Sequence, residues 1–185
     1  MNLPNKLTVA RILMVIPFIA ILEIADENFY FNKDFYLNKY FYIDLVAAAI
    51  FLIASLTDFL DGYIARKRNL ITNFGKLMDP LSDKILVISA MVIFVAKNYI
   101  SAWAVIIIIS REFFVTGIRI IAASKGDVIP ADKSGKYKTA VQMIAIVLII
   151  FTKTSVFSDL LMIPPVVLTI WSGYEYLTKS RKYFD

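Results

Sequence analysis

Long apolar runs alternate with short polar segments along the whole chain. An α-helix rises about 1.5 Å per residue, so the run at 42–65 is long enough to cross the ~30 Å hydrocarbon core of a bilayer. The pattern predicts six spans, at 12–24, 42–65, 73–96, 102–123, 133–151 and 156–177. We therefore expect an all-α, polytopic integral membrane protein with six transmembrane helices and a short N-terminal interfacial segment at 1–11.

The composition supports the same class. The chain has 185 residues, of which 59% are hydrophobic, and its mean hydropathy is +0.69. Such values are typical of membrane proteins rather than of soluble domains. We expect a single membrane domain over 1–185. Lys6 and Arg11 before the first apolar run resemble the charged start of a signal peptide, but further spans follow, so we expect a retained helix.

The basic residues, which give a net charge of +5, are unevenly distributed. The segments predicted to lie outside hold only Lys33, Lys39, Lys97 and Lys153. The positive-inside rule then places both termini and the segment between the second and third spans in the cytoplasm. Because the basic residues alternate with apolar spans rather than with stacking aromatics, we expect a lipid bilayer and no nucleic acid as partner.

Four aspartates lie at the inner ends of the second and third spans. Asp58 and Asp61 are three residues apart and Asp79 and Asp83 are four apart, so each pair projects from one helix face. Two facing helices would gather the four carboxylates, an arrangement that is unfavourable unless a cation compensates them. A lone aspartate would more often cap a helix or form a salt bridge, but the four together predict a metal site.

The available ligands indicate which metal would bind. The chain has no cysteine and no histidine, so the candidate ligands are oxygens, which favour Mg²⁺ or Mn²⁺ over zinc or copper. The same absences exclude disulfides, thiolate nucleophiles and a serine-histidine triad. Beside the aspartates, Gly62 and Gly75 would let a nucleotide approach the backbone, and Arg66 would bind a phosphate.

The fourth span carries two charges, Arg111 and Glu112, inside an apolar run. Arg111 lies about 12 Å along the helix from the interfacial Trp103, near the middle of the bilayer. A charge there costs roughly 2.5 to 3.5 kcal/mol on insertion scales, so it should face a polar interior. Arg119 follows two turns later on roughly the same side. A structural ion pair between Arg111 and Glu112 is the alternative to a binding role.

The aspartates belong to a longer pattern, D-x2-D-G-x2-A-R-x8-G-x3-D-x3-D, which resembles the signature of the CDP-alcohol phosphatidyltransferases. Its positions are filled by Asp58, Asp61, Gly62, Ala65, Arg66, Gly75, Asp79 and Asp83. The resemblance implies CDP-diacylglycerol as the donor, cytidine near Gly62, Ala65 and Gly75, and the diphosphate on two metal ions held by the four aspartates. It also implies Asp83 as the catalytic base and a homodimeric assembly.

Three shorter matches resemble the bacterial branch of this family that uses glycerol 3-phosphate as the acceptor. They are Pro4-Asn5-x-Leu7-Thr8-x2-Arg11, Arg111-Glu112-Phe113-x2-Thr116-Gly117-x-Arg119 and Gly135-Lys136-x-Lys138-Thr139. The acceptor's phosphate would need cations of its own, and Arg111, Arg119 and Lys136 are the candidates, with Asn5 and Thr8 as possible substrate contacts. The alternatives are that Thr8 caps a helix and that the lysines snorkel to the membrane surface.

The expected reaction is a direct transfer in the bacterial cytoplasmic membrane. The acceptor hydroxyl, deprotonated by Asp83, attacks the phosphorus attached to diacylglycerol, and CMP leaves. One alternative is another acceptor of the same family, of the cardiolipin, phosphatidylserine or inositol-phosphate type. A second is a divalent cation transporter, although aspartates confined to one interface beside a basic loop make a poor cation entrance. A purely structural subunit would leave the aspartate cluster unexplained.

Overall fold

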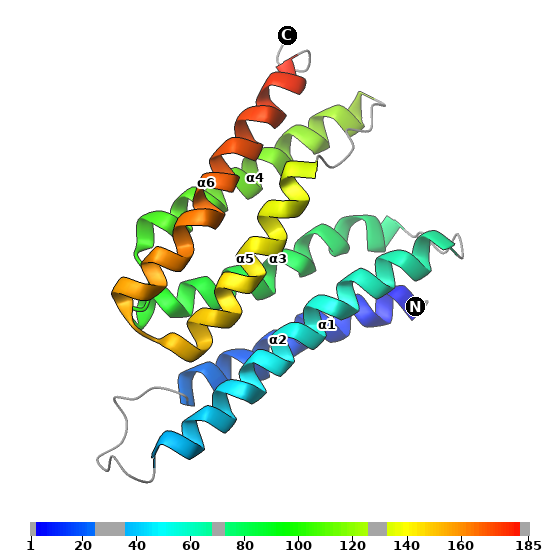
Figure 1. Cartoon of the computed structure of the whole chain (residues 1–185). Coiled ribbons are helices and arrows are strands. Elements are labelled where there is room, and N and C mark those ends of the chain that lie inside the picture. Colours follow the sequence, from blue (N-terminus) through cyan, green and yellow to red (C-terminus); the bar gives the residue numbers. More distant parts are fainter. Residues whose placement is uncertain (1–2, 25–35, 68–72, 126–132, 182–185) are drawn as a thin grey trace. The chain divides into compact units, whose positions relative to one another are not determined.

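The computed structural model describes the backbone of 3–24, 36–67, 73–125 and 133–181, and side chains at 8–24, 41–57, 82, 84–125 and 134–181. The described backbone is entirely helical apart from short connections, as the hydropathy pattern predicts. Within the described residues, six helices follow one another (Figure 1). They are α1 (Leu3–Ile24), α2 (Tyr36–Lys67), α3 (Asn73–Ala96), α4 (Ala102–Ser124), α5 (Lys133–Thr152) and α6 (Ser155–Lys179).

The predicted boundaries agree with the observed ones in the C-terminal half and differ near the N-terminus. The α3–α4 turn lies at 97–101 as predicted, whereas α1 begins at Leu3 rather than at residue 12. The polar segment at 3–11 is therefore the first part of α1 rather than a separate element, and its position at the membrane interface stays a prediction. Thr8 lies inside the helix, so the prediction that it caps a helix is wrong. Its burial, and that of Arg11, explain why these polar residues continue the helix.

Contacts divide the chain into two compact units, 1–97 and 98–185. In the first unit α1 packs along α2 and α3. Small side chains of α2, such as Ala47 and Ala54, are fully buried and allow α1 to approach closely. The Phe18 ring of α1 meets the Phe51 ring of α2 at a centroid distance of 5.8 Å. The described helices of this unit therefore enclose a closely packed core that is mainly apolar and includes a few buried polar residues.

In the second unit α6 packs against both α4 and α5. At the start of α4, Asp159 of α6 accepts hydrogen bonds from the Ser101 backbone N–H at 2.7 Å and from its hydroxyl at 2.6 Å. The first N–H groups of a helix have no partner within the helix, so this carboxylate connects α6 to the N-terminus of α4. The opposite half of the unit carries the charged residues described below.

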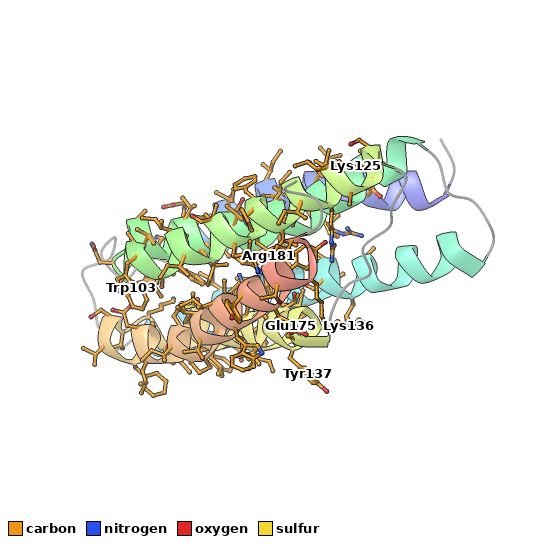
Figure 2. The ribbon with its side chains drawn as sticks, turned by 90° about the horizontal axis from the view of Figure 1, so that it is seen from above. Trp103, Lys125, Lys136, Tyr137, Glu175 and Arg181 are labelled. Atoms are coloured by element: carbon orange, nitrogen blue, oxygen red, sulfur yellow. The ribbon has the colours of Figure 1, made fainter. Side chains whose placement is uncertain are left out.

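The outer surfaces of the second unit are apolar. Figure 2 shows side chains pointing away from the helices, with Trp103 at one end and Lys125 and Lys136 towards the other. The exposed large apolar residues include Ile106, Phe113, Ile120, Ile144, Leu160, Val167 and Trp171. By length and composition, 134–152 and 155–179 are each able to cross a membrane, and 41–57 and 84–96 are shorter apolar stretches. Such a surface suits contact with lipid rather than with water.

Candidate active site

The two halves of the aspartate motif lie on consecutive helices of the first unit. Asp58 and Asp61 fall in the last turns of α2, and Asp79 and Asp83 in the first half of α3. Lys67 and Asn73, which end and begin these helices, are at most roughly 20 Å apart because only six peptide steps join them. The chain connectivity alone therefore keeps the end of α2 and the start of α3 within this distance of each other.

The side chains of this motif lie outside the described residues. The same holds for the proposed nucleotide contacts Gly62, Ala65, Arg66 and Gly75, and for Asn5. Among the described side chains there is no group of three acidic or other metal-binding residues, so the four aspartates remain the candidate metal ligands. Their carboxylate oxygens suit a hard divalent cation. The metal site and the nucleotide contacts stay predictions.

α1 is attached to α3 by a buried polar contact next to this motif. Arg11 donates a hydrogen bond from NH1 to the Ser82 hydroxyl at 3.0 Å, and both side chains are buried. Ser82 directly precedes Asp83. Thr8 lies one helical turn before Arg11 and is also buried. The N-terminal motif therefore contributes to the interior of the first unit, and Thr8 as a substrate contact stays a prediction.

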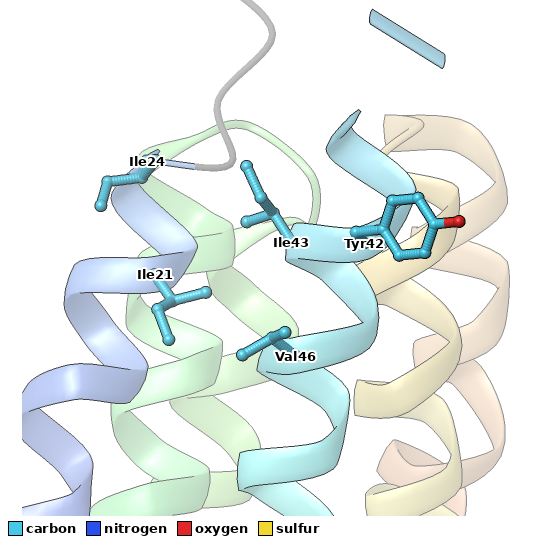
Figure 3. A pocket seen from close by; sticks show the side chains of 5 residues that line it. All are labelled: Ile21, Ile24, Tyr42, Ile43 and Val46. Carbon is cyan, nitrogen blue, oxygen red and sulfur yellow. The ribbon is translucent and has the colours of Figure 1, made fainter. Parts of the chain in front are cut away.

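An apolar pocket of about 320 Å³ opens between the end of α1 and the start of α2 (Figure 3). It is lined by Ile21, Ile24, Tyr42, Ile43 and Val46, which present only apolar atoms to it. Such a lining offers no group that binds phosphate or moves a proton. The chemistry must therefore be sought elsewhere.

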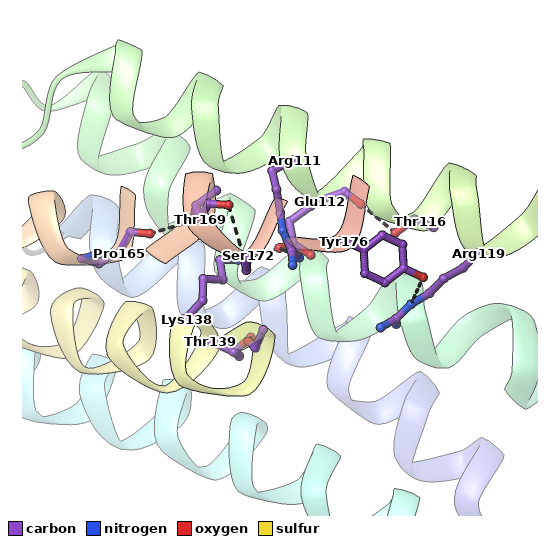
Figure 4. A network of polar contacts seen from close by, with 11 residues as sticks. Arg111, Glu112, Thr116, Arg119, Lys138, Thr139, Pro165, Thr169, Ser172 and Tyr176 are labelled. Carbon is purple, nitrogen blue, oxygen red and sulfur yellow. Dashed lines mark hydrogen bonds and ion pairs between the residues drawn. The ribbon is translucent and has the colours of Figure 1, made fainter. Parts of the chain in front are cut away.

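In the second unit two cationic side chains, Arg111 and Lys138, meet at one carboxylate oxygen of Glu112 (Figure 4). Glu112 Oε1 accepts hydrogen bonds from Arg111 NH1 at 3.2 Å and from Lys138 Nζ at 2.5 Å. The exposed fractions of these side chains are 18% for Glu112, 15% for Arg111 and 4% for Lys138. Arg111 therefore turns away from lipid, as its position in an apolar helix requires. The Arg111–Glu112 ion pair, which was the alternative to a binding role, is present. The three side chains together carry one net positive charge.

Two glycines border the Arg111 side chain. A Cβ atom added at Gly173 of α6 would lie 3.3 Å from Arg111 Cγ, and one added at Gly135 of α5 would lie 3.6 Å from NH2. The contact at Gly173 is tighter than an ordinary van der Waals contact, whereas the one at Gly135 is ordinary. The Arg111 side chain therefore passes close to the backbone of α6 at Gly173, and its guanidinium lies beside Gly135 of α5.

Arg119 interacts with a tyrosine that sequence reasoning did not single out. Its Nε donates a hydrogen bond to the Tyr176 hydroxyl at 3.3 Å, and its guanidinium carbon lies 5.6 Å from the ring centroid, a cation–π distance. The Tyr176 ring is buried against Val115 and Ile118 of α4. Arg119 itself is exposed, so the tyrosine fixes its direction without enclosing it.

The structure distinguishes the lysines of α5. Lys138 reaches Glu112, whereas Lys136 is exposed, because residues two apart on a helix point in different directions. Lys136 as a phosphate contact stays a prediction, and the sequence favoured Lys133 and Lys138 less than Lys136 for this role. The three-residue spacing of Gly135 and Lys138 was the available signal. For Tyr176 the signal in the sequence was the helical spacing of three polar residues, Thr169, Ser172 and Tyr176, which the structure shows to be buried along one face of α6.

Comparison with known proteins agrees with the motifs. Residues 1–171 match the CDP-alcohol phosphatidyltransferase family. A CDP-diacylglycerol–glycerol-3-phosphate 3-phosphatidyltransferase from Bacillus subtilis is 43% identical, with 97% of this chain and 95% of that protein covered. Proteins of the same name from Rickettsia felis and Treponema pallidum are 38% and 31% identical, over 99% and 96% of this chain and 97% and 88% of theirs. The chain belongs to the CDP-alcohol phosphatidyltransferase family.

Proposed function

We propose that the protein transfers a phosphatidyl group from CDP-diacylglycerol to glycerol 3-phosphate, releasing CMP and forming phosphatidylglycerophosphate. It is then a phosphatidylglycerophosphate synthase. Similarity over nearly the full length of relatives that bear this activity in their names supports the assignment. The structural observation that carries it is Arg111, a cation in an apolar helix whose guanidinium turns inwards beside a second cation, Lys138. A phosphate-bearing acceptor needs such a site, whereas a neutral acceptor does not.

The donor is assigned to the first unit. Asp58, Asp61, Asp79 and Asp83 would hold two divalent cations, Mg²⁺ or Mn²⁺, and their all-oxygen donor set fits these ions. When bound, the cations would neutralise the charge of the donor diphosphate. Gly62, Ala65 and Gly75 would lie against the cytidine, and Arg66 would pair with a phosphate. The diacylglycerol tails remain in the bilayer.

Asp83 acts as the general base of the transfer. Its carboxylate takes the proton of the acceptor hydroxyl while that oxygen forms a bond to the phosphorus attached to diacylglycerol. The bond from this phosphorus to the CMP oxygen breaks, and CMP departs with the bonding electrons. The step needs in-line positioning and charge compensation and no covalent enzyme intermediate. Arg11 and Ser82 support it by packing α1 against α3 beside Asp83.

The acceptor phosphate is assigned to the second unit, to Arg111, Arg119 and Lys136, with Asn5 and Thr8 as further substrate contacts from α1. Arg111 supplies a partly enclosed guanidinium and Arg119 one that is directed by Tyr176. We further propose a multi-pass homodimer in the bacterial cytoplasmic membrane, with both termini and the aspartates on the cytoplasmic side. That side supplies the soluble acceptor.

CMP release by detergent-solubilised protein tests the assignment. CDP-diacylglycerol and Mg²⁺ are supplied with glycerol 3-phosphate, serine, inositol phosphate or phosphatidylglycerol in turn. We expect release with glycerol 3-phosphate alone, its loss on chelation of the metal and in Asp83→Asn, and wild-type release in Glu23→Gln, a matched change at an exposed carboxylate. Release with a different acceptor would overturn the acceptor assignment. No release from folded protein with any acceptor would overturn the transferase.

A further inference from the structure

We infer that Glu112 is a positioning residue of the acceptor pocket, whose carboxylate holds the Lys138 ammonium and the Arg111 guanidinium side by side for the phosphate of the acceptor. The inference rests on the proposed function, because it concerns the same pocket. It goes beyond it by adding Lys138 to the cations of the pocket. It also assigns to an acidic side chain a role in binding an anion.

The distances show that one oxygen organises both cations. Arg111 NH1 and Lys138 Nζ donate to the same atom, Glu112 Oε1, from α4 and α5 respectively. Like charges this close repel one another unless an opposite charge lies between them. Lys138 is almost fully buried, and the Glu112 carboxylate supplies an opposite charge at its ammonium. Removal of the carboxylate would take away the atom to which both cations are bonded.

The hydrogen bonds of Arg111 indicate that the pair is not complete in itself. An arginine serving only an ion pair commonly forms two parallel bonds to a carboxylate. Arg111 bonds Glu112 through NH1 alone, and its buried Nε has no hydrogen-bond partner among the described residues. A buried donor without a partner is unfavourable, which indicates that a further acceptor group belongs there. A phosphate oxygen is an acceptor of the required charge.

Two effects oppose each other when Glu112 is neutralised. The net charge of the cluster rises by one, which by itself would strengthen anion binding. Against this, the buried Lys138 loses the carboxylate to which it is bonded, and Arg111 loses the bond that directs it. We expect the second effect to prevail, because a displaced cation no longer contacts the phosphate, whereas screened attraction gains little.

Steady-state kinetics of Glu112→Gln in the CMP-release assay test this expectation. We expect the KM for glycerol 3-phosphate to rise about tenfold or more, with the KM for CDP-diacylglycerol and kcat changed much less. Glu112→Asp, which keeps the carboxylate, should recover part of the affinity. Glu23→Gln is the matched control, since Glu23 also pairs with a lysine, Lys97, but belongs to the first unit.

A second variant covers the case in which Glu112→Gln does not fold. In Glu112→Gln/Lys138→Met the buried ammonium disappears together with its counter-charge, and replacement of a buried pair in this way is often tolerated. We expect this variant to fold and still to bind the acceptor weakly. A folded variant of either kind with a wild-type or lowered KM for glycerol 3-phosphate would overturn the inference.

Arg111→Ala separates the inference from the function on which it rests. A raised acceptor KM in Arg111→Ala together with an unchanged KM in Glu112→Gln would retain the pocket and reject the positioning role. An unchanged KM in Arg111→Ala would reject the pocket itself. Activity that requires another acceptor would reject the proposed function before either variant is measured.

Discussion

Replacement of Gly173 by alanine should weaken acceptor binding and should stabilise the protein less than an alanine at an unobstructed glycine does. The added Cβ would lie 3.3 Å from Arg111 Cγ, closer than an ordinary van der Waals contact, so the arginine stem must move by a few tenths of an ångström. The guanidinium cannot follow freely, because NH1 is bonded to Glu112 and NH2 lies beside Gly135. The change therefore strains the bond between Arg111 and Glu112 and disturbs the position of the guanidinium, while leaving its charge intact.

The chain offers a matched control in Gly117→Ala on α4. A Cβ at Gly117 would meet nothing within 4 Å, so this variant isolates the gain from replacing a glycine within a helix, about 1 kcal/mol. Gly173→Ala has the same gain, reduced by a packing cost of about 1 to 3 kcal/mol. The two variants should thus differ by about 1 to 3 kcal/mol in the free energy of unfolding. For a chain of this length, that corresponds to a difference of roughly 2 to 12 °C in Tm.

Thermal unfolding in detergent and the acceptor KM measure the two consequences separately. We expect Gly117→Ala to be more stable than the wild type with an unchanged KM for glycerol 3-phosphate. We expect Gly173→Ala to fall below Gly117→Ala in Tm and to raise the acceptor KM by roughly threefold to tenfold, because a small misplacement of a binding group is enough to weaken it. Equal Tm and equal KM in the two variants would refute the close contact and the role assigned to Arg111.

Two further predictions concern α6. In Tyr176→Phe, Arg119 loses a hydrogen bond of 3.3 Å but keeps its contact with the ring, so we expect the acceptor KM to rise about two- to fivefold while Tm changes little. The control Tyr174→Phe, at an exposed tyrosine, should alter neither quantity. Equal acceptor KM values in the two variants would contradict the role of the Tyr176 hydroxyl. In Asp159→Ala, Ser101 loses two hydrogen-bond acceptors, which should lower the free energy of unfolding by about 1 to 3 kcal/mol without changing the acceptor KM. An unchanged Tm would show that the contact does not stabilise the second unit.

The helices and the family were predictable because both depend on local patterns. Length and hydrophobicity of each run indicate a span, and the observed α4, α5 and α6 begin and end within two residues of the prediction. The aspartate motif has fixed spacing within a short stretch, so it is recognisable without knowledge of the fold. The start of α1 was missed because polar residues at 3–11 indicated an interface, whereas Thr8 and Arg11 are buried within the first unit.

The partners of the charged side chains were decided by the tertiary structure. Sequence reasoning placed Arg111 in a polar interior but did not show that Lys138, 26 residues beyond Glu112, completes the cluster. Nor did it show that Tyr176 directs Arg119, or that Gly173 leaves room for the arginine stem. Hydropathy depends only on the residues within a span and thus determines which segments are helices. Contacts between side chains distant in sequence depend on how each helix is rotated and aligned against its neighbours, and only packing settles that.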